Sequence, residues 1–451
     1  LRLVVDGGRE AVQALTRLRA AGVPVLLRVD FPVEPRPDTP TLERLEARAR
    51  AIGRPLTDAM VQSAVRADRD IRVAEPVGRF TERHRLWQEQ VDAAAILAAS
   101  AHPFAITTRG QRDATQFFAN LRLAIAAGLS HDAALEALTL GPARILGVDR
   151  QLGSLETGKI GNVTLLDGRL EEVDARVRWV VVDGVPYEQT PAASDPSNQD
   201  DQPATPEDET AEPAPSGEDG WPVETDASRV PATRTGGDVL IRNATVLTMA
   251  DAGVLPETDI LVRDMVIVEI DRDLTAPSGV TVVDAAGAWV MPGIIDDHSH
   301  MATDGGINEA SLSITAQVRI EDVLRGDDLT LYRAAAGGVT TANVLHGSAN
   351  TIGGQRAVIQ MKYGVPATEL LFDGYPRGIK FALGENVTRR RDRFPNTRMG
   401  QEAVIRRALT EAQFYQAAWT AYDTEVQRAD RPLAPPRRDL RLETLAGILS
   451  G

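Results

Sequence analysis

The sequence contains no cysteine, few aromatic residues and no long hydrophobic run. Without cysteine, this chain of 451 residues has no disulfide framework, no thiolate metal ligand and no cysteine nucleophile. Aromatic residues make up only 4%, so aliphatic side chains must fill the cores. No run of roughly 18 apolar residues, the length that reads as a membrane-spanning helix, is present. The sequence therefore indicates neither a disulfide scaffold nor a transmembrane helix.

The charge balance excludes two classes of partner. The formal net charge is −15 and the pI is about 5.0, which argues against nucleic acid and anionic membranes as partners. A small-molecule substrate is the partner we expect, and a homo-oligomer stays open. The sequence starts at Leu1 rather than Met, so a targeting segment upstream would be invisible, and a periplasmic or a cytoplasmic location stays open.

Strand and helix patterns alternate in the first 148 residues. The apolar patterns predict strands over residues 1–6, 23–30 and 104–108, and helices over residues 10–21, 41–77, 86–99, 117–128 and 132–140. Strands that alternate with helices in this order indicate parallel βα units.

An acidic, proline-rich stretch follows. Residues 189–220 hold nine Asp or Glu and no Lys or Arg. Such a segment cannot bury enough apolar surface to offset its ordering entropy, so we predict a disordered acidic linker. A solvated tether is the simple interpretation, and a partner-binding tail is the alternative.

Strand patterns resume after the linker. Short β patterns are found at residues 239–248, 259–263, 266–270 and 280–284, with further strands predicted at 339–347 and 378–385. A helix is predicted over residues 327–337, and the remainder is helical and rich in arginine.

One stretch organises the second half: residues 288–300, which read Ala-Trp-Val-Met-Pro-Gly-Ile-Ile-Asp-Asp-His-Ser-His. Side chains alternate along a strand, so His298 and His300 project to the same side. Two imidazoles on one face can bind a single metal ion through ring nitrogens. Two histidines in a solvated loop are the alternative.

This frame resembles the first barrel strand of the amidohydrolase superfamily. A second likeness is the Gly-Ser-Leu-Glu-Thr-Gly-Lys turn at residues 153–159, which is similar to the turn after the last barrel helix of these proteins. The likeness is to an imidazolonepropionase-like, tandem subgroup. It implies a metal-dependent hydrolase with a (β/α)8 TIM barrel beside a small β-sandwich.

The order of these parts is unusual, because the end of one repeat precedes the start of another. We expect the C-terminal half of a first barrel at residues 1–148, sandwich strands at 149–188, the linker at 189–236, sandwich strands of a second repeat at 237–291 and the N-terminal half of a second barrel at 292–451. The predicted fold class is thus α/β, with partial barrel halves and composite-domain strands. A fragment of a tandem protein is the first interpretation, and a permuted barrel is the alternative.

The resemblance assigns roles to three further residues. Lys380 matches the lysine on the fourth strand that becomes carboxylated and bridges two metals, and a strand-capping salt bridge is the alternative. Glu385 is the rival carboxylate, as a metal ligand or a substrate-binding group. His346 ends the second strand, where substrate binding and a purely structural role are equally open.

The first half departs from the family pattern. Strand eight ends Ile106-Thr-Thr-Arg109, where the family has Ser-Asp, and strand six ends in Asp6, where the family has a ligand histidine. We therefore interpret the first repeat as non-catalytic. The general-base aspartate of the second repeat is expected beyond Gly451.

The resemblance implies hydrolysis of a non-peptide or cyclic-amide C–N bond with one or two divalent ions, zinc first. An inactive scaffold of amidohydrolase fold is the alternative function. A third possibility is an acidic partner-binding protein, which predicts that deletion of residues 189–220 abolishes function.

Overall fold

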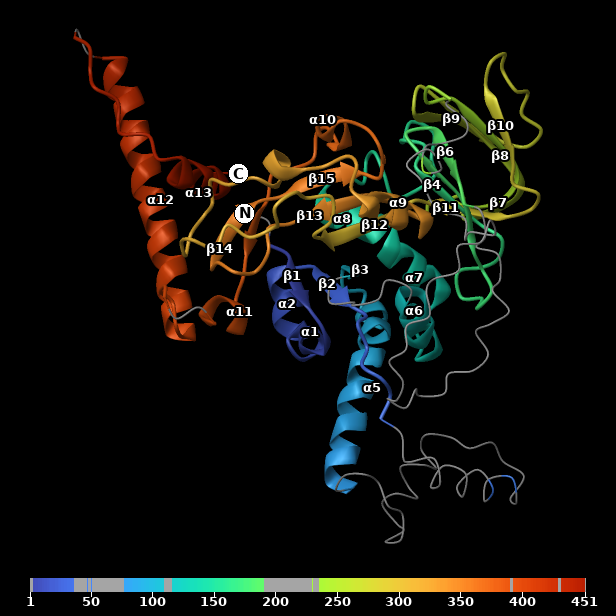
Figure 1. Ribbon diagram of the computed structural model, residues 1–451, viewed down its shortest axis with the longest axis horizontal. Coiled ribbons are helices and arrows are strands. Elements are labelled where there is room, and N and C mark those ends of the chain that lie inside the picture. The colour runs from blue at the N-terminus through green and yellow to red at the C-terminus, as the bar shows by residue number, and fades with distance from the viewer. Residues whose placement is uncertain are drawn as a thin grey trace, which may run out of the picture. The chain divides into compact units, whose positions relative to one another are not determined.

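The computed structural model describes most of the chain, and its helices and strands are labelled in Figure 1. The described residues are 3–35, 47, 50, 77–108, 116–189, 229, 235–389, 392–428 and 431–450. They divide into two compact units, Leu1–Gly147 with Asp296–Ser299, and Val148–Ile295 with His300–Gly451. Nearly all of the helix expected at 41–77 and of the linker expected at 189–236, and Arg109, lie outside the described residues.

Three parallel strands form the sheet of the first unit. They are β1 (Val5–Gly7), β2 (Val25–Arg28) and β3 (Phe104–Thr107), in the order β1-β2-β3. Val5 lies opposite Val25, which lies opposite Phe104. The apolar residues of β2 and β3 are buried, as is usual for a parallel sheet that helices cover. The predicted parallel arrangement of these strands is confirmed.

Short helices connect the strands of the first unit. The described helices are α1 (Arg9–Gln13), α2 (Leu15–Ala21), α5 (Val77–Ala99), α6 (Gln116–Ala126), α7 (His131–Leu138) and α8 (Leu140–Leu146). The single helix predicted for residues 10–21 is wrong, because Ala14 separates α1 from α2. Gly22 ends α2 in the left-handed conformation that glycine adopts without strain.

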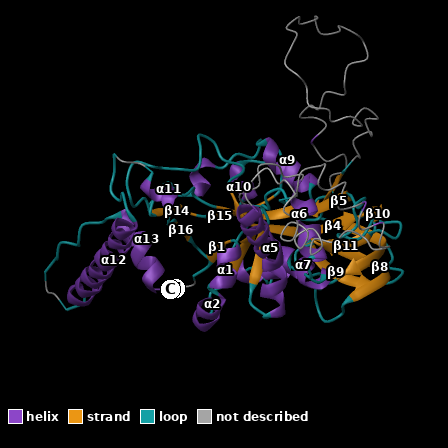
Figure 2. Cartoon of the chain, turned by 90° about the horizontal axis from the view of Figure 1, so that it is seen from below, coloured by secondary structure: helices purple, strands orange, loops and turns teal. Residues whose placement is uncertain are grey.

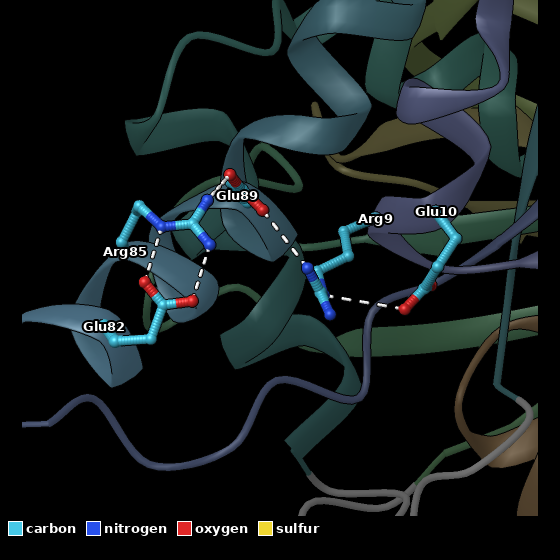
Figure 3. Close-up of polar contacts among 5 residues, drawn as sticks. All are labelled: Arg9, Glu10, Glu82, Arg85 and Glu89. Atoms are coloured by element: carbon cyan, nitrogen blue, oxygen red, sulfur yellow. Dashed lines mark hydrogen bonds and ion pairs between the residues drawn. The ribbon is translucent and has the colours of Figure 1, made fainter. Parts of the chain in front are cut away.

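Arginine and glutamate side chains connect α1 to α5 (Figure 3). Arg9 donates to Glu89 at 3.3 Å and lies 3.5 Å from Glu10. On α5, Arg85 donates to both carboxylate oxygens of Glu82, at 2.7 and 2.9 Å, and also to Glu89. Glu89 is thus shared by two arginines. Exposed pairs of this kind contribute little stability each, so the network mainly sets the orientation of α1 on α5.

The second unit contains an eight-stranded sheet. Its order is β6-β5-β4-β11-β7-β8-β9, with β10 paired to β7. The strands are β4 (Val163–Leu166), β5 (Val177–Val182), β6 (Val185–Glu188), β7 (Val239–Leu247), β8 (Val254–Arg263), β9 (Val266–Asp271), β10 (Thr281–Asp284) and β11 (Trp289–Pro292).

The central pairing of this sheet joins the two sides of the linker. Strand β4 runs antiparallel to β11, with Leu165 opposite Val290. Both residues belong to one buried aliphatic cluster that β7, β8 and β9 also line. The strands expected at 149–188 and at 237–291 as separate sets therefore form one sheet, because a single apolar core covers them.

Two smaller sheets complete the second unit. Their strands are β12 (Ile294–Ser299), β13 (Val339–Val344) and β15 (Ala357–Gln360), in that order, and β14 (Ile352–Gln355) with β16 (Ile379–Phe381). Strand β13 is antiparallel to β15, and β14 is antiparallel to β16. Only Ile294 and Ile295 of β12 belong to the second unit. The described residues thus show a mixed α/β fold, in which antiparallel pairs stand beside the predicted parallel ones.

The helices of the second unit vary widely in length. They are the 3-10 helix η2 (Ile320–Val323), α9 (Leu329–Ala336), α10 (Ala367–Leu370), α11 (Glu385–Thr388), α12 (Arg398–Val426) and α13 (Leu440–Ser450). Helices α12 and α13 lie side by side in both views (Figures 1 and 2) and share a core around Ala412 and Leu445. No helix within the described ranges is long and apolar enough to cross a membrane.

Candidate metal centre

His298 is held by a carboxylate in the first unit. Its Nδ1 lies 2.6 Å from Oδ2 of Asp6, and the histidine is only 2% exposed. The other oxygen of Asp6 lies 3.4 Å from Nε of Arg28. Asp6 therefore connects the guanidinium of Arg28 to the imidazole of His298.

The register of the parallel sheet explains this placement. Asp6 lies opposite Leu26, and Arg28, two residues further along β2, lies opposite Thr107. Side chains two residues apart share a face, so Asp6, Arg28 and Thr107 are on the same face of the sheet. They lie at or next to the carboxyl ends of the strands, where parallel α/β folds carry their sites.

Asp296 is bound by two threonines of the same unit. Its Oδ2 accepts a hydrogen bond from the Thr108 hydroxyl at 2.7 Å, and its Oδ1 accepts one from the Thr107 hydroxyl at 3.3 Å. The backbone N–H of His298 also donates to Asp296 Oδ1, at 3.3 Å. Two neutral hydroxyls thus stand at the end of β3, where the resemblance expects a Ser-Asp pair.

His300 is oriented by the backbone of the second unit. Its Nδ1 lies 2.8 Å from the carbonyl oxygen of Leu345. A carbonyl can only accept, so Nδ1 carries the proton and Nε2 carries the lone pair. The contact of His298 with Asp6 is an ion-pair distance and does not assign the proton to either ring nitrogen in the same way.

Metal-binding histidines commonly donate one ring N–H to a carboxylate or a backbone carbonyl and bind the ion through the other nitrogen. His300 has such an acceptor, the Leu345 carbonyl, whereas the contact of His298 with Asp6 is an ion-pair distance. Within the described part of the chain, no group of three or more His, Asp or Glu side chains could hold a metal. The roles of His298 and His300 as metal ligands stay predictions.

His346 uses both ring nitrogens inside the second unit. Its Nδ1 donates to the carbonyl of Gly347 at 2.9 Å, and its Nε2 accepts from the backbone N–H of Glu309 at 2.9 Å. Burial lowers the pKa of His346 below its usual 6.5, and the nearby Lys380 charge also lowers it. The neutral imidazole thus connects two loops. Substrate binding by His346 stays a prediction, and the hydrogen bonds favour the structural alternative.

Two glycines allow β14 to approach His346. A Cβ atom added at Gly353 would lie 2.6 Å from Nδ1 of His346, and one at Gly354 would lie 3.0 Å from Cδ2 of the same ring. Real Cβ atoms essentially never show the shorter contact, so glycine is required for this packing. Gly353 and Gly354 are thus strand residues packed on an imidazole.

Amide and guanidinium groups hold the loop before η2. Asn350 Nδ2 donates to the carbonyls of Glu309 and Leu312, at 2.6 Å each, and to the Thr315 hydroxyl at 3.1 Å. Arg393 donates to the carbonyl of Leu312 at 2.9 Å, and also to that of Ala310. The loop around residue 309 is therefore held by hydrogen bonds to Asn350 and Arg393, and its Glu309 N–H contacts His346.

Lys380 and Glu385 lie in different surroundings. Lys380 is in the middle of β16 and is 9% exposed, and its charge acts on His346. Glu385 is exposed in the first turn of the four-residue helix α11. The placement of Lys380 suits a buried site better than that of Glu385, and both roles stay predictions.

The remaining histidines, His84, His102 and His131, belong to the first unit. His102 Nε2 lies 3.1 Å from the Val23 carbonyl, and His84 Nε2 lies 3.9 Å from Glu34. His131 is the first residue of α7. These contacts and positions therefore support structural roles for the histidines of the first unit.

Sequence reasoning missed the partners of His298 and Asp296. The sequence indicated Asp6 only for the histidine it replaces, and Thr108 only as part of the strand end Ile106-Thr-Thr-Arg109. The signal that could have found them is their shared position at the carboxyl ends of neighbouring parallel strands.

Comparison with known proteins shows which proteins this chain is similar to. A model of the amidohydrolase family matches residues 41–197. The protein "Amidohydrolase tasK" of Hapsidospora irregularis is 34% identical over 34% of this chain and 18% of its own length. The chain is thus similar to amidohydrolases over these segments. A second relative, a dihydroorotase of Pelobacter propionicus, is 43% identical over 15% of this chain and 16% of its own length.

The chain spans less than a fifth of the length of either relative. Among solved structures, an amidohydrolase from Thermotoga maritima MSB8 is 30% identical, covers 47% of this chain and 55% of that chain, and has a TM-score of 0.41. The family match lies before the histidine pair, and it includes β3 and β4.

Proposed function

We propose that this chain is part of an amidohydrolase and contributes the first two ligands of a divalent metal centre that hydrolyses a C–N bond in an amide or cyclic amide. The observation that carries the proposal is the orientation of His300 in the His298-Ser-His300 motif. Its Nδ1 donates to the Leu345 carbonyl, so the ring presents Nε2 as the ligand nitrogen, and Nδ1 of His298 lies 2.6 Å from the Asp6 carboxylate.

The side chains have distinct tasks in this proposal. His298 and His300 would hold the ion, with zinc as the first candidate because imidazole ligands suit it. When bound, the ion supplies Lewis acidity, which activates water and polarises a carbonyl group. Lys380 would bridge a second ion only in a carboxylated form, because an ammonium group repels cations.

Such a reaction also needs a group that transfers protons. The family usually has an aspartate for this role at the end of strand eight, and the described strand ends supply none there. Thr107 and Thr108 stand at the end of β3, and both hydroxyls bind Asp296. We therefore propose that the general base comes from sequence beyond Gly451.

The strand pairing in the large sheet supports two halves of the chain that complement each other, rather than two independent sandwiches. Strand β4 precedes the linker and β11 follows it, yet they pair along Val163–Leu166 and Trp289–Pro292. In this proposal, the partial barrel halves on the two sides of the linker share one composite sandwich. The threonine pair at β3 also supports a second candidate function, an inactive scaffold that binds metal without turnover.

Hydrolysis assays separate the two candidates. The chain, loaded with Zn²⁺ or Mn²⁺, is offered a panel of cyclic amides such as dihydroorotate, chosen from the name of the dihydroorotase relative. The enzyme proposal predicts turnover that is lost in the His298→Ala/His300→Ala variant. Metal binding without turnover, also after extension of the chain past Gly451, favours the scaffold.

A further inference from the structure

We propose that residues 148–188 are a docking segment, which binds the sheet of residues 235–292 without help from the covalent linker. Both ranges belong to the second unit. This binding is independent of any metal site, because it concerns only how the two sides of the linker hold together. The two sides could then be separate polypeptides and still form one sheet.

Backbone pairing joins the docking segment to the sheet at two places. Strand β4 runs antiparallel to β11 along its whole length, with Leu165 opposite Val290. The turn before β4 pairs with β9, where the N–H of Gly158 donates to the Ile267 carbonyl at 2.7 Å and the N–H of Ile267 donates to the Lys159 carbonyl at 2.7 Å. Buried backbone groups need such partners, and here the partners lie on the other side of the linker.

One apolar core contains side chains from both sides of the linker. Val163, Leu165 and Val181 of the docking segment are fully buried in one cluster with Ile241 and Val290. Burial of apolar surface is the main favourable term in the association of polypeptides. A cut in the linker would leave this burial unchanged.

Buried polar contacts make the docking segment specific for this sheet. Asp183 lies 2.6 Å from Lys362 and accepts a hydrogen bond from Gln360 at 2.5 Å. The Thr164 hydroxyl donates to the Gly338 carbonyl at 2.8 Å. A different strand edge would leave these buried groups without partners, which penalises wrong pairings.

The linker is far longer than the connection requires. The Thr235 hydroxyl donates to the carbonyl of Gly184, and β6 leads from Gly184 to Gln189. A strand of that length spans about 17 Å. About five or six extended residues would cover such a distance, whereas the chain uses residues 190–234. A short tether is therefore not what holds the docking segment in place.

The test cuts the full-length chain inside the linker. A site for a sequence-specific protease is inserted between Ser197 and Asn198, before Arg229, whose guanidinium lies 5.9 Å from the centre of the Tyr363 ring. A flexible linker supplies an effective concentration in roughly the millimolar range, so the cut removes that contribution. At micromolar protein, we expect the cut chain to elute as one species, with a native mass equal to both fragments together.

A matched pair of substitutions shows whether the sheet holds the fragments. Val163→Ala removes buried atoms of the core, and Val173→Ala is the control in the same docking segment, because Val173 is 71% exposed. The dissociation constant of the cut chain is measured by dilution at a fixed, sub-denaturing urea concentration. Val163→Ala should raise it by roughly tenfold or more, and Val173→Ala should leave it unchanged.

A second variant covers the case in which Val163→Ala does not fold in the uncut chain. Thr164→Val keeps the shape of the side chain and loses the hydroxyl that donates to Gly338. It should raise the dissociation constant by roughly 2- to 10-fold.

Two results would overturn the proposal. One is separation of the fragments after the cut at micromolar protein, while the uncut chain is folded. The other is a cut chain that stays assembled with the same dissociation constant in the β4 variants and in Val173→Ala, because contacts outside the sheet would then hold the fragments together.

Discussion

Lys362 Nζ lies 2.6 Å from Oδ2 of Asp183 in the second unit. Asp183 forms the tight turn between β5 and β6, with a φ of 51°, and its other oxygen accepts from Gln360 at 2.5 Å. The backbone N–H of Asp183 donates to Asn162 Oδ1 at 2.8 Å. Through this one aspartate, the strands before the linker are fixed to β15 after it.

Lys362→Met should therefore destabilise the chain. The substitution leaves a largely buried carboxylate without its cation, and the expected loss is about 2–3 kcal/mol in the free energy of unfolding. Urea denaturation measures it. The exposed pair Arg406–Glu402 on α12 is the control, and Arg406→Met should have a far smaller effect. Equal effects of the two substitutions would contradict the role of Asp183.

Gly353→Ala should be destabilising for a steric reason. The new Cβ would lie 2.6 Å from Nδ1 of His346, and forced overpacking of this kind costs about 1–3 kcal/mol. Gly447→Ala in α13 is the matched control, because its Cβ would meet no atom within 4 Å. That substitution should stabilise the helix by roughly 0.5–1 kcal/mol. A neutral Gly353→Ala would show that β14 does not pack on the ring.

Acid should destabilise the chain partly through His346. Burial lowers its pKa in the folded state below the usual 6.5, so at falling pH the unfolded state takes up the proton first. The free energy of unfolding therefore falls as the pH drops from about 7 towards the lower folded-state pKa, and levels off below it.

Denaturation curves between pH 7 and pH 5 measure this effect. His346→Gln should show a smaller loss of stability over that range than the unsubstituted chain. His131→Gln, at the start of α7, controls for the removal of one histidine. An identical pH dependence of stability in all three chains would show that His346 does not contribute to the acid destabilisation.

Local patterns in the sequence were enough to predict several parts of this fold. The apolar runs around Val25, Phe104 and Val239 predicted strands that the structure contains, because such runs are short and bounded by turn residues. The break at Ala14 was missed, since one residue with ordinary helix propensity carries no signal. Strand partners were also missed at β4 and β11, because a period of two indicates a face and not a neighbour.

The site was predictable in its residue types and not in its contacts. The sequence motif around residue 296 indicated His298 and His300 as candidate metal ligands. The close contact of His298 is with Asp6, which lies near the start of the chain, and only tertiary structure brings the two together. The partners of His300 and His346 are backbone groups of Leu345, Gly347 and Glu309, which side-chain patterns do not reveal.

The most direct test of the account is the metal content of the purified chain by elemental mass spectrometry, compared with His298→Ala/His300→Ala and with His131→Ala. We expect near-stoichiometric zinc, manganese or iron in the unsubstituted chain and in His131→Ala, and loss of the metal in the double variant. Metal that persists in the double variant, or its absence from all three chains, would contradict a metal centre built on His298 and His300.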